Sequence, residues 1–420
     1  MLSSLFARRQ GNGPIPVYLL LMTGQAICFS LFFTVQLIYQ VTVVGLTPFQ
    51  MVLVGTVLEA TFVVFEIPTG VFADVYSRRL AILIGIVLMG CSYALEGSVP
   101  VFWAMIVSQV LWGVGGTYTT GATQAWITDE IGEAAAGSVF LRGSQMRLVG
   151  GLVGTLLSVL LGATTIQAPM ILAGLGMLTL AAVLTLVMPE THRHVAELAA
   201  RSTFRHIKAT ARESFRVAMS RPVVKVIITI SLVVGLAAET FDRLNVPFVI
   251  DRFDFPTLFG NGSPVIWFGI SGVIGSMLGL ASSEMFKRIR PEALGAGSPA
   301  RLLAACAGIQ VATLAIFALS GNLWLAFGML WVRTSAASVS QPVEAAWLNR
   351  NLDPATRATV GSMSGQANSL GQVGGGLALG WVGSAVSIQA ALLASAAVLS
   401  PTVALYRRLI VRDLGASEET

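Results

Sequence analysis

Two apolar runs that flank one short charged loop decide the fold. Residues 47–97 read TPFQMVLVGTVLEATFVVFEIPTGVFADVYSRRLAILIGIVLMGCSYALEG. Each run supplies the roughly 20 predominantly apolar residues that an α-helix needs to cross the hydrocarbon core of a bilayer. The loop between them, GVFADVYSRR, ends in Arg78 and Arg79. These features predict two membrane-spanning helices joined by a short turn.

The composition of the whole chain agrees with a membrane environment. Of the 420 residues, 55% are hydrophobic and only 11% are charged, and the mean hydropathy is +0.77. Soluble domains carry about 25% charged residues, so a chain of this composition needs lipid as the solvent for most of its surface. Cys28, Cys91 and Cys306 all lie inside apolar runs, so we predict no disulfide framework.

Twelve runs are apolar and long enough to span, which predicts an all-α polytopic membrane protein. A polar, basic segment divides the chain into an N-terminal six-helix bundle (1–188), a cytoplasmic linker (189–221) and a C-terminal six-helix bundle with a short tail (222–420). Within the linker, residues 197–219 have the pattern of an amphipathic helix that lies against the anionic leaflet. The predicted spans cover 17–42, 47–73, 79–97, 100–128, 137–162, 168–188, 222–250, 263–286, 301–320, 322–348, 358–383 and 386–406.

The basic residues predict the orientation of these spans. Most of the 26 Lys and Arg residues lie in or beside the terminal segments and the loops that follow even-numbered spans. The exceptions are Arg147, Arg243, Arg252 and Arg333. Positive charge favours cytoplasmic loops, so we predict a plasma (inner) membrane protein with both termini in the cytoplasm. The first apolar run is too long for a cleaved signal peptide and is predicted to remain as a span.

The two halves also resemble each other in sequence. At a constant offset of 221 residues the chain aligns Trp126 with Trp347, Gln145 with Gln366, Gly150 with Gly371 and Gly154 with Gly375. Internal repeats are common in transporters, and small residues let membrane helices approach closely. We therefore predict a duplicated bundle with glycines at helix–helix contacts.

The charged loop resembles the signature loop of the major facilitator superfamily. That signature has Gly, three residues, Asp, a basic residue, any residue, Gly and two basic residues. Gly70, Asp74, Arg78 and Arg79 match it, whereas Val75 and Ser77 depart from it. The resemblance implies twelve helices in two halves, with a loop that contacts the opposite half in the outward-facing state. By that analogy Asp74 and Arg78 form a charge lock that also involves Gly70 and Arg79.

Two further stretches, EIPTG at 66–70 and AWITDE at 125–130, resemble the drug-efflux branch of this superfamily near its macrolide-exporter-like members. The chain lacks the span-four arginine of many drug/proton antiporters, near whose place Gln109 stands, and residues 143–154 lack the proline of the span-five antiporter signature. The resemblance implies proton-coupled efflux of small lipophilic compounds or drugs by alternating access. Proton-symport uptake, flipping of a lipid-like substrate and a non-transporting receptor or scaffold remain alternatives.

Charges inside the predicted spans mark the functional candidates. An ionisable side chain at the centre of a membrane helix costs about 2.5–3.5 kcal/mol on insertion scales, so such residues are rare unless they have a role. Spans three, six, nine and twelve carry essentially none away from their ends, which suits helices that face lipid. The remaining spans carry Glu59, Glu66, Arg147, Glu239, Asp242, Arg243, Arg333 and Glu344.

Three carboxylates are predicted to carry the coupling proton. Glu59 lies near the middle of its span, and Glu66 is seven residues further along the same helix face. The spacing of Glu239 and Arg243 lets them neutralise each other, which leaves Asp242 as the third candidate. A buried carboxylate that takes and releases a proton can switch between two packings. The alternative is a static ion pair that fixes helix register.

Polar, aromatic and basic residues of the same spans are predicted to line the substrate cavity. Arg147 and Arg333 would pair with the coupling carboxylates or hold an anionic group of the substrate. The other predicted cavity residues are Gln25, Gln36, Gln109, Tyr118, Glu239, Trp331 and Gln366.

The sequence argues against an enzyme. None of its three lysines stands in a phosphate-binding loop of the Walker type, and its three histidines all lie in the linker, away from any metal-binding helix motif. We predict no cofactor, no metal and no nucleic-acid partner. The expected partners are a small-molecule substrate, protons and the lipid bilayer, and the expected state is a monomer.

Overall fold

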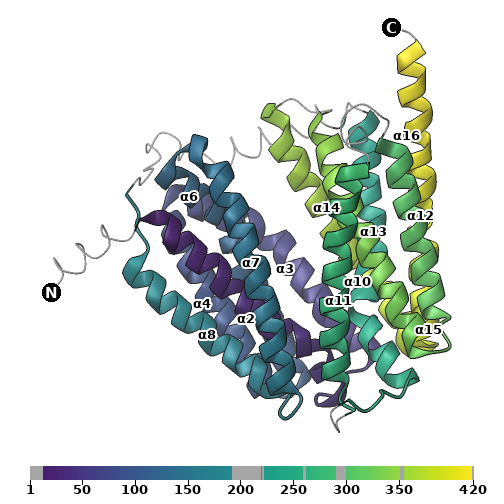
Figure 1. Ribbon diagram of the computed structural model, residues 1–420, viewed down its shortest axis with the longest axis horizontal. Helices are drawn as coiled ribbons and strands as arrows, with labels where there is room; N and C mark the ends of the chain where they lie inside the picture. The colour runs from purple at the N-terminus through teal and green to yellow at the C-terminus, as the bar shows by residue number, and fades with distance from the viewer. Residues whose placement is uncertain are drawn as a thin grey trace, which may run out of the picture. The chain divides into compact units, whose positions relative to one another are not determined.

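The computed structural model describes residues 13–191, 219, 222–258, 262–289, 299–350 and 354–418, and its named elements are all helices (Figure 1). The helices before the predicted linker are α2 (Pro14–Thr42), α3 (Pro48–Val75), α4 (Arg78–Ser98), α5 (Phe102–Thr119), α6 (Ala122–Ile131), α7 (Glu133–Gly162) and α8 (Gln167–Val187). Those after it are α10 (Pro222–Arg252), α11 (Pro264–Ile289), α12 (Pro299–Ala318), α13 (Leu323–Arg350), α14 (Pro354–Ala385), α15 (Ile388–Leu399) and α16 (Pro401–Glu418).

The predicted all-helical, polytopic fold is confirmed. Each of the twelve predicted spans falls on helix, and nine of the described helical segments are long and apolar enough to cross a membrane. Proline is the first residue of seven helices, because its fixed φ suits the first turn and its missing N–H would have no partner there. These prolines are Pro14, Pro48, Pro222, Pro264, Pro299, Pro354 and Pro401. The predicted linker helix lies outside the described residues, apart from Met219.

Two predicted spans are divided in the structure. Residues 100–128 form α5 and α6, separated at Gly121, whose φ of +76° lies in the left-handed region that glycine adopts at little cost. Gly132, with a φ of +80°, makes the turn from α6 into α7 in the same way. Residues 386–406 form α15 and α16, and Pro401 is the first residue of the second piece. Apolar composition predicts a span but carries no information about these backbone breaks.

The structure divides into two compact units. Unit 1 comprises the described residues of Met1–Leu46, Val57–Arg201 and Thr257–Gly269, and unit 2 those of Thr47–Thr56, Ser202–Pro256 and Ile270–Thr420. In unit 1, α2 packs against α7 and α8, and α4 packs against α5 and α8. In unit 2, α10 packs against α14 and α15, and α12 packs against α13, α15 and α16.

The repeated glycines lie at the tightest helix contacts of each unit. In unit 1 a Cβ on Gly154 of α7 would stand 2.3 Å from the carbonyl oxygen of Ile27 on α2. In unit 2 a Cβ on Gly375 of α14 would stand 2.1 Å from the carbonyl oxygen of Leu236 on α10. Equivalent glycines of the sequence repeat therefore serve equivalent helix pairs, as the repeat predicts.

We expect Gly154→Ala and Gly375→Ala each to destabilise the protein by about 1–3 kcal/mol, because the added methyl group collides with backbone that cannot rotate away. Gly151→Ala and Gly374→Ala are matched controls on the same two helices, since a Cβ there would stand 3.4 Å and 3.9 Å from its nearest neighbour. Thermal unfolding in detergent measures the difference. Equal melting temperatures for all four variants would contradict the close-packing role.

Candidate functional site

A buried ion pair anchors the charged segment of α10. Arg243 Nε donates to Glu239 Oε1 at 2.9 Å, and the two residues are 8% and 3% exposed. The four-residue spacing places both side chains on one face of the helix, as the sequence predicts. The pair therefore cancels two of the charges that α10 brings into unit 2.

Asp242 lies beside this pair but is exposed. The positive charges of Arg333 on α13 and Arg243 on α10 both act on its carboxylate. Arg333 also lies over the ring of Phe241, with its guanidinium carbon 4.2 Å from the ring centroid. Its Nη1 is buried without a hydrogen-bond partner among the described residues. The structure thus brings together Glu239, Asp242 and Arg333, three of the predicted site residues.

The charges of this group balance when every member is ionised. Glu239 and Asp242 carry two negative charges, and Arg243 and Arg333 carry two positive charges.

The other two predicted coupling carboxylates lie on α3. Glu59 and Glu66 are both half-buried, and each interacts with another part of the structure. Within unit 1, α3 packs closely on α5, because a Cβ on Gly113 would stand 2.8 Å from Thr61 and one on Gly116 would stand 2.8 Å from Phe62. At its other end α3 approaches the ion pair of α10, because a Cβ on Gly55 would stand 1.5 Å from Glu239 Oε1.

Unit 1 contains a buried carboxylate that the sequence prediction missed. Glu96 of α4 is 0% exposed, and its carboxylate accepts four hydrogen bonds from neutral side chains. On Oε1 it accepts from Gln36 Nε2 at 3.0 Å and Gln40 Nε2 at 2.8 Å. On Oε2 it accepts from Ser108 Oγ at 2.8 Å and Gln109 Nε2 at 3.2 Å. The Glu96 network thus joins α2, α4 and α5.

Glu96 escaped prediction because it lies close to the end of its apolar run, where a charge normally reaches water. Gln36 and Gln40 share one face of α2, and this polar pair inside an apolar helix is the sequence signal that could have revealed a buried partner. Gln36 and Gln109, predicted to line the substrate cavity, are each 1% exposed and donate to Glu96.

Aromatic side chains gather beside this network. Phe32 stacks on Tyr93 with ring centroids 4.1 Å apart. Phe33 contacts Trp112 at 4.8 Å and Phe29 at 4.1 Å. Phe29 is 47% exposed, so part of the surface of this aromatic group is accessible.

The remaining predicted cavity residues are spread over both units. Gln25 is half-buried on α2, and Arg147 on α7 is exposed, with its charge acting on Tyr18. Tyr118 meets Phe72 edge to face at 5.4 Å. Trp331 donates from Nε1 to the backbone oxygen and Oγ of Ser271, each at 3.1 Å, and Gln366 is half-buried on α14. The described contacts do not join these five residues into one site.

The signature loop forms a charged cluster within unit 1. Arg78 is paired with Asp129 at the end of α6 and lies 3.5 Å from Asp74. Ser77, which replaces the glycine of the family signature, accepts from Leu80 N as the N-cap of α4. Arg79 donates to the carbonyl oxygen of Thr185 at 2.7 Å. The Asp74 side chain is 70% exposed, so it is accessible to a further partner.

The sequence as a whole matches the family model described as Major Facilitator Superfamily over residues 16–379. The chain belongs to the Major Facilitator Superfamily. It is therefore a multi-pass membrane transporter of small molecules and not an enzyme, as the sequence predicts.

Solved structures of other transporters share the fold. The nucleoside transporter NupG has a TM-score of 0.75 at 15% identity, over 95% of this chain and 99% of that one. A POT family transporter has a TM-score of 0.71 at 11% identity, over 96% of each chain. A bacterial homologue of the human lysosomal transporter Spinster has a TM-score of 0.71 at 15% identity, over 94% of this chain and 97% of that one.

A curated relative matches part of the sequence. YxaM of Bacillus subtilis (strain 168), an uncharacterized MFS-type transporter, is 25% identical over 123 residues. The match spans 29% of this chain and 31% of the relative's length. These comparisons establish the superfamily but do not distinguish the drug-efflux branch from others.

Proposed function

We propose that this member of the superfamily is a proton-coupled exporter of small lipophilic compounds that works by alternating access. The observation that carries the proposal is the Asp242 carboxylate, which is exposed beside the charges of Arg333 and Arg243 while its neighbour Glu239 is neutralised. One proton there changes the charge balance of the group. Glu59 and Glu66 are the further coupling carboxylates that we propose.

The proposed substrate is apolar or weakly cationic. The partly exposed aromatic group of Phe29, Phe33 and Trp112 suits a planar lipophile. Carboxylates at Glu59 and Glu66 suit a weak positive charge. Arg147 and Arg333 could bind the anionic group of a zwitterionic substrate. The other residues proposed to line the substrate cavity are Gln25, Gln36, Gln109, Tyr118, Glu239, Trp331 and Gln366.

Alternating access in this proposal is a rocking of residues 1–188 against residues 222–420, tethered by 189–221, in a monomer with both termini in the cytoplasm. The signature loop, with Gly70, Asp74, Arg78 and Arg79, would hold one end closed, and the exposed Asp74 is the residue available for that contact. One proton that moves down 100 mV provides about 2.3 kcal/mol, enough for a roughly fiftyfold gradient at one-to-one stoichiometry.

Inverted membrane vesicles test the direction and the substrate class together. With an inward-acidic gradient imposed, we expect vesicles that contain the protein to accumulate lipophilic dyes or drugs, and a protonophore to abolish the accumulation. Accumulation only in right-side-out vesicles would show that the protein takes up its substrate and does not export it. Movement of labelled lipids without movement of any dye would show that the protein flips lipids. Absence of transport for every compound tested would contradict the proposal that the substrates are lipophiles.

A further inference from the structure

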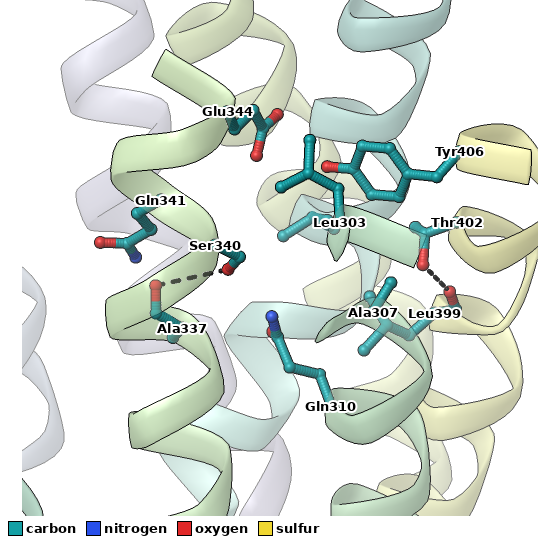
Figure 2. Close-up of a pocket in the computed structure, with 11 residues that line it drawn as sticks. Leu303, Ala307, Gln310, Ala337, Ser340, Gln341, Glu344, Leu399, Thr402 and Tyr406 are labelled. Atoms are coloured by element: carbon teal, nitrogen blue, oxygen red, sulfur yellow. Dashed lines mark hydrogen bonds between the residues drawn. The ribbon is translucent and has the colours of Figure 1, made fainter. Parts of the chain in front are cut away.

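A small cavity lies inside unit 2, and none of the charged residues described above lines it. Its volume is about 120 Å³, and it is bounded by α10, α12, α13, α15 and α16 (Figure 2). An engineered cavity of about 150 Å³ in another protein binds benzene, so this space suits a ligand of about five non-hydrogen atoms. The lining residues are Val234, Leu303, Ala307, Gln310, Ala337, Ser340, Gln341, Glu344, Leu399, Thr402 and Tyr406.

Short side chains on facing helices create the space. Leu303, Ala307 and Gln310 follow one face of α12, and Ala337, Ser340 and Glu344 follow one face of α13 at the same helical spacing. Ala307 and Ala337 do not fill the gap that a Leu at either position would occupy. The cavity is therefore encoded in the choice of residues at these positions.

One carboxylate dominates the chemistry of the cavity. Glu344 is half-buried and turns toward the space, which the Tyr406 side chain also lines (Figure 2). Ser340 and Thr402 donate their hydroxyl protons to Ala337 O and Leu399 O, at 3.3 Å and 2.7 Å. The oxygens of these two hydroxyl groups remain able to accept. The polar part of the wall therefore offers the Glu344 carboxylate and two hydroxyl acceptors, together with the amides of Gln310 and Gln341, of which the Gln310 amide points into the space (Figure 2).

The rest of the wall is apolar, through Val234, Leu303 and Leu399, and among the eleven residues that line the cavity there is no Lys, Arg or His. A negative group beside acceptors and apolar carbon recognises a positively charged N–H donor with a short apolar body. An anion would meet the Glu344 carboxylate without a compensating charge in the wall.

The cavity and the proposed coupling group have no lining residue in common. Glu344 follows Arg333 by eleven residues on α13, about 16 Å at 1.5 Å per residue, whereas Ala337, the nearest lining residue, follows Arg333 by four residues, about 6 Å. Val234 precedes Asp242 by eight residues on α10, about 12 Å by the same rise. Neither Asp242 nor Arg333 lines the cavity, and Arg333 lies one helical turn from its wall.

We propose that this cavity is a binding site for a primary ammonium group on a short apolar body, with Glu344 as its counter-charge. The site does not depend on which solute the chain transports or in which direction. Both a free alkylamine and the ethanolamine headgroup of a lipid carry this chemistry.

Thermal unfolding of the purified, delipidated protein with n-butylammonium chloride tests the site. We expect a saturable rise in melting temperature with a Kd on the order of 1 mM, as befits a five-atom ligand. Equal concentrations of 1-butanol, which has the same number of non-hydrogen atoms but no charge, and of NaCl should produce no saturable rise. In nanodiscs, weaker butylammonium binding with phosphatidylethanolamine than with phosphatidylcholine would identify the lipid headgroup as the ligand, and equal binding would identify a free amine.

Two substitutions and one control make the test specific. Glu344→Gln should weaken butylammonium binding at least tenfold, and Ala337→Leu should abolish it by filling the cavity. Glu284→Gln removes an exposed carboxylate of the same unit and should leave binding unchanged. The proposal is overturned if native protein shows no saturable shift, if 1-butanol matches butylammonium, or if Glu344→Gln binds as the native protein does. Should Glu344→Gln fail to fold, the alcohol comparison and Ala337→Leu decide the question.

Discussion

Asp242→Asn is expected to abolish proton-driven accumulation while leaving substrate exchange without a gradient intact. The amide keeps the size of the side chain but cannot take up or release a proton, so the group of Glu239, Arg243 and Arg333 would remain in one charge state. The native protein should reach a roughly fiftyfold substrate gradient per 100 mV, and the variant should reach none. Accumulation and counterflow in vesicles with matched expression measure the two activities separately.

A second acid on the same helix provides the control for this experiment. Asp251 lies at the end of α10 and is exposed, so Asp251→Asn should accumulate substrate as the native protein does. Full accumulation by Asp242→Asn would exclude Asp242 as the coupling group. Glu59→Gln and Glu66→Gln, measured in the same assay, would then show whether coupling resides on α3.

Glu96→Ala is expected to be the most destabilising single substitution in unit 1. It removes an acceptor that receives four hydrogen bonds and leaves Gln36, Gln40, Ser108 and Gln109 with buried donors. Side-chain hydrogen bonds in membrane proteins average about 0.6 kcal/mol each, and a cavity adds to the loss, so we expect about 2–4 kcal/mol. Thermal unfolding in detergent measures the effect.

The conservative variant separates the hydrogen bonds from the volume of the side chain. Glu96→Gln keeps the shape and one acceptor oxygen, so it should lose about half as much stability as Glu96→Ala. Glu133→Ala removes an exposed acid at the start of α7 and should have no measurable effect. A melting temperature of Glu96→Ala equal to that of Glu133→Ala would show that the Glu96 network contributes nothing to stability.

Helix positions were predictable because apolar length is a strong signal. The run predicted at 222–250 is α10, Pro222–Arg252, and the run predicted at 168–188 is α8, Gln167–Val187. The break at Gly121 was not predictable from hydropathy, because it depends on one backbone angle in an otherwise apolar stretch. The glycine contacts were predictable from the repeat, because close approach of two helices leaves no room for a Cβ.

The site was predictable only in part. The spacing of Glu239 and Arg243 fixes their pairing within one helix, so the sequence suffices for it. The approach of Arg333 to Phe241 depends on how α13 packs against α10, which no local pattern encodes. To predict that Glu96 is buried, one would need to know how α4 packs against both α2 and α5, because its four hydrogen-bond donors come from those two helices. The cavity at Glu344 arises from gaps between helices and leaves no motif in the sequence.

Substrate-driven proton movement in proteoliposomes is the measurement that decides whether transport is coupled to protons. The purified protein is reconstituted with a pH-sensitive dye in the lumen, and a transported lipophile is added to one side without any imposed gradient. We expect a pH change in the lumen that requires the substrate, follows the direction of exchange and is absent from Asp242→Asn. Substrate transport that leaves the luminal pH unchanged in the native protein would contradict proton coupling.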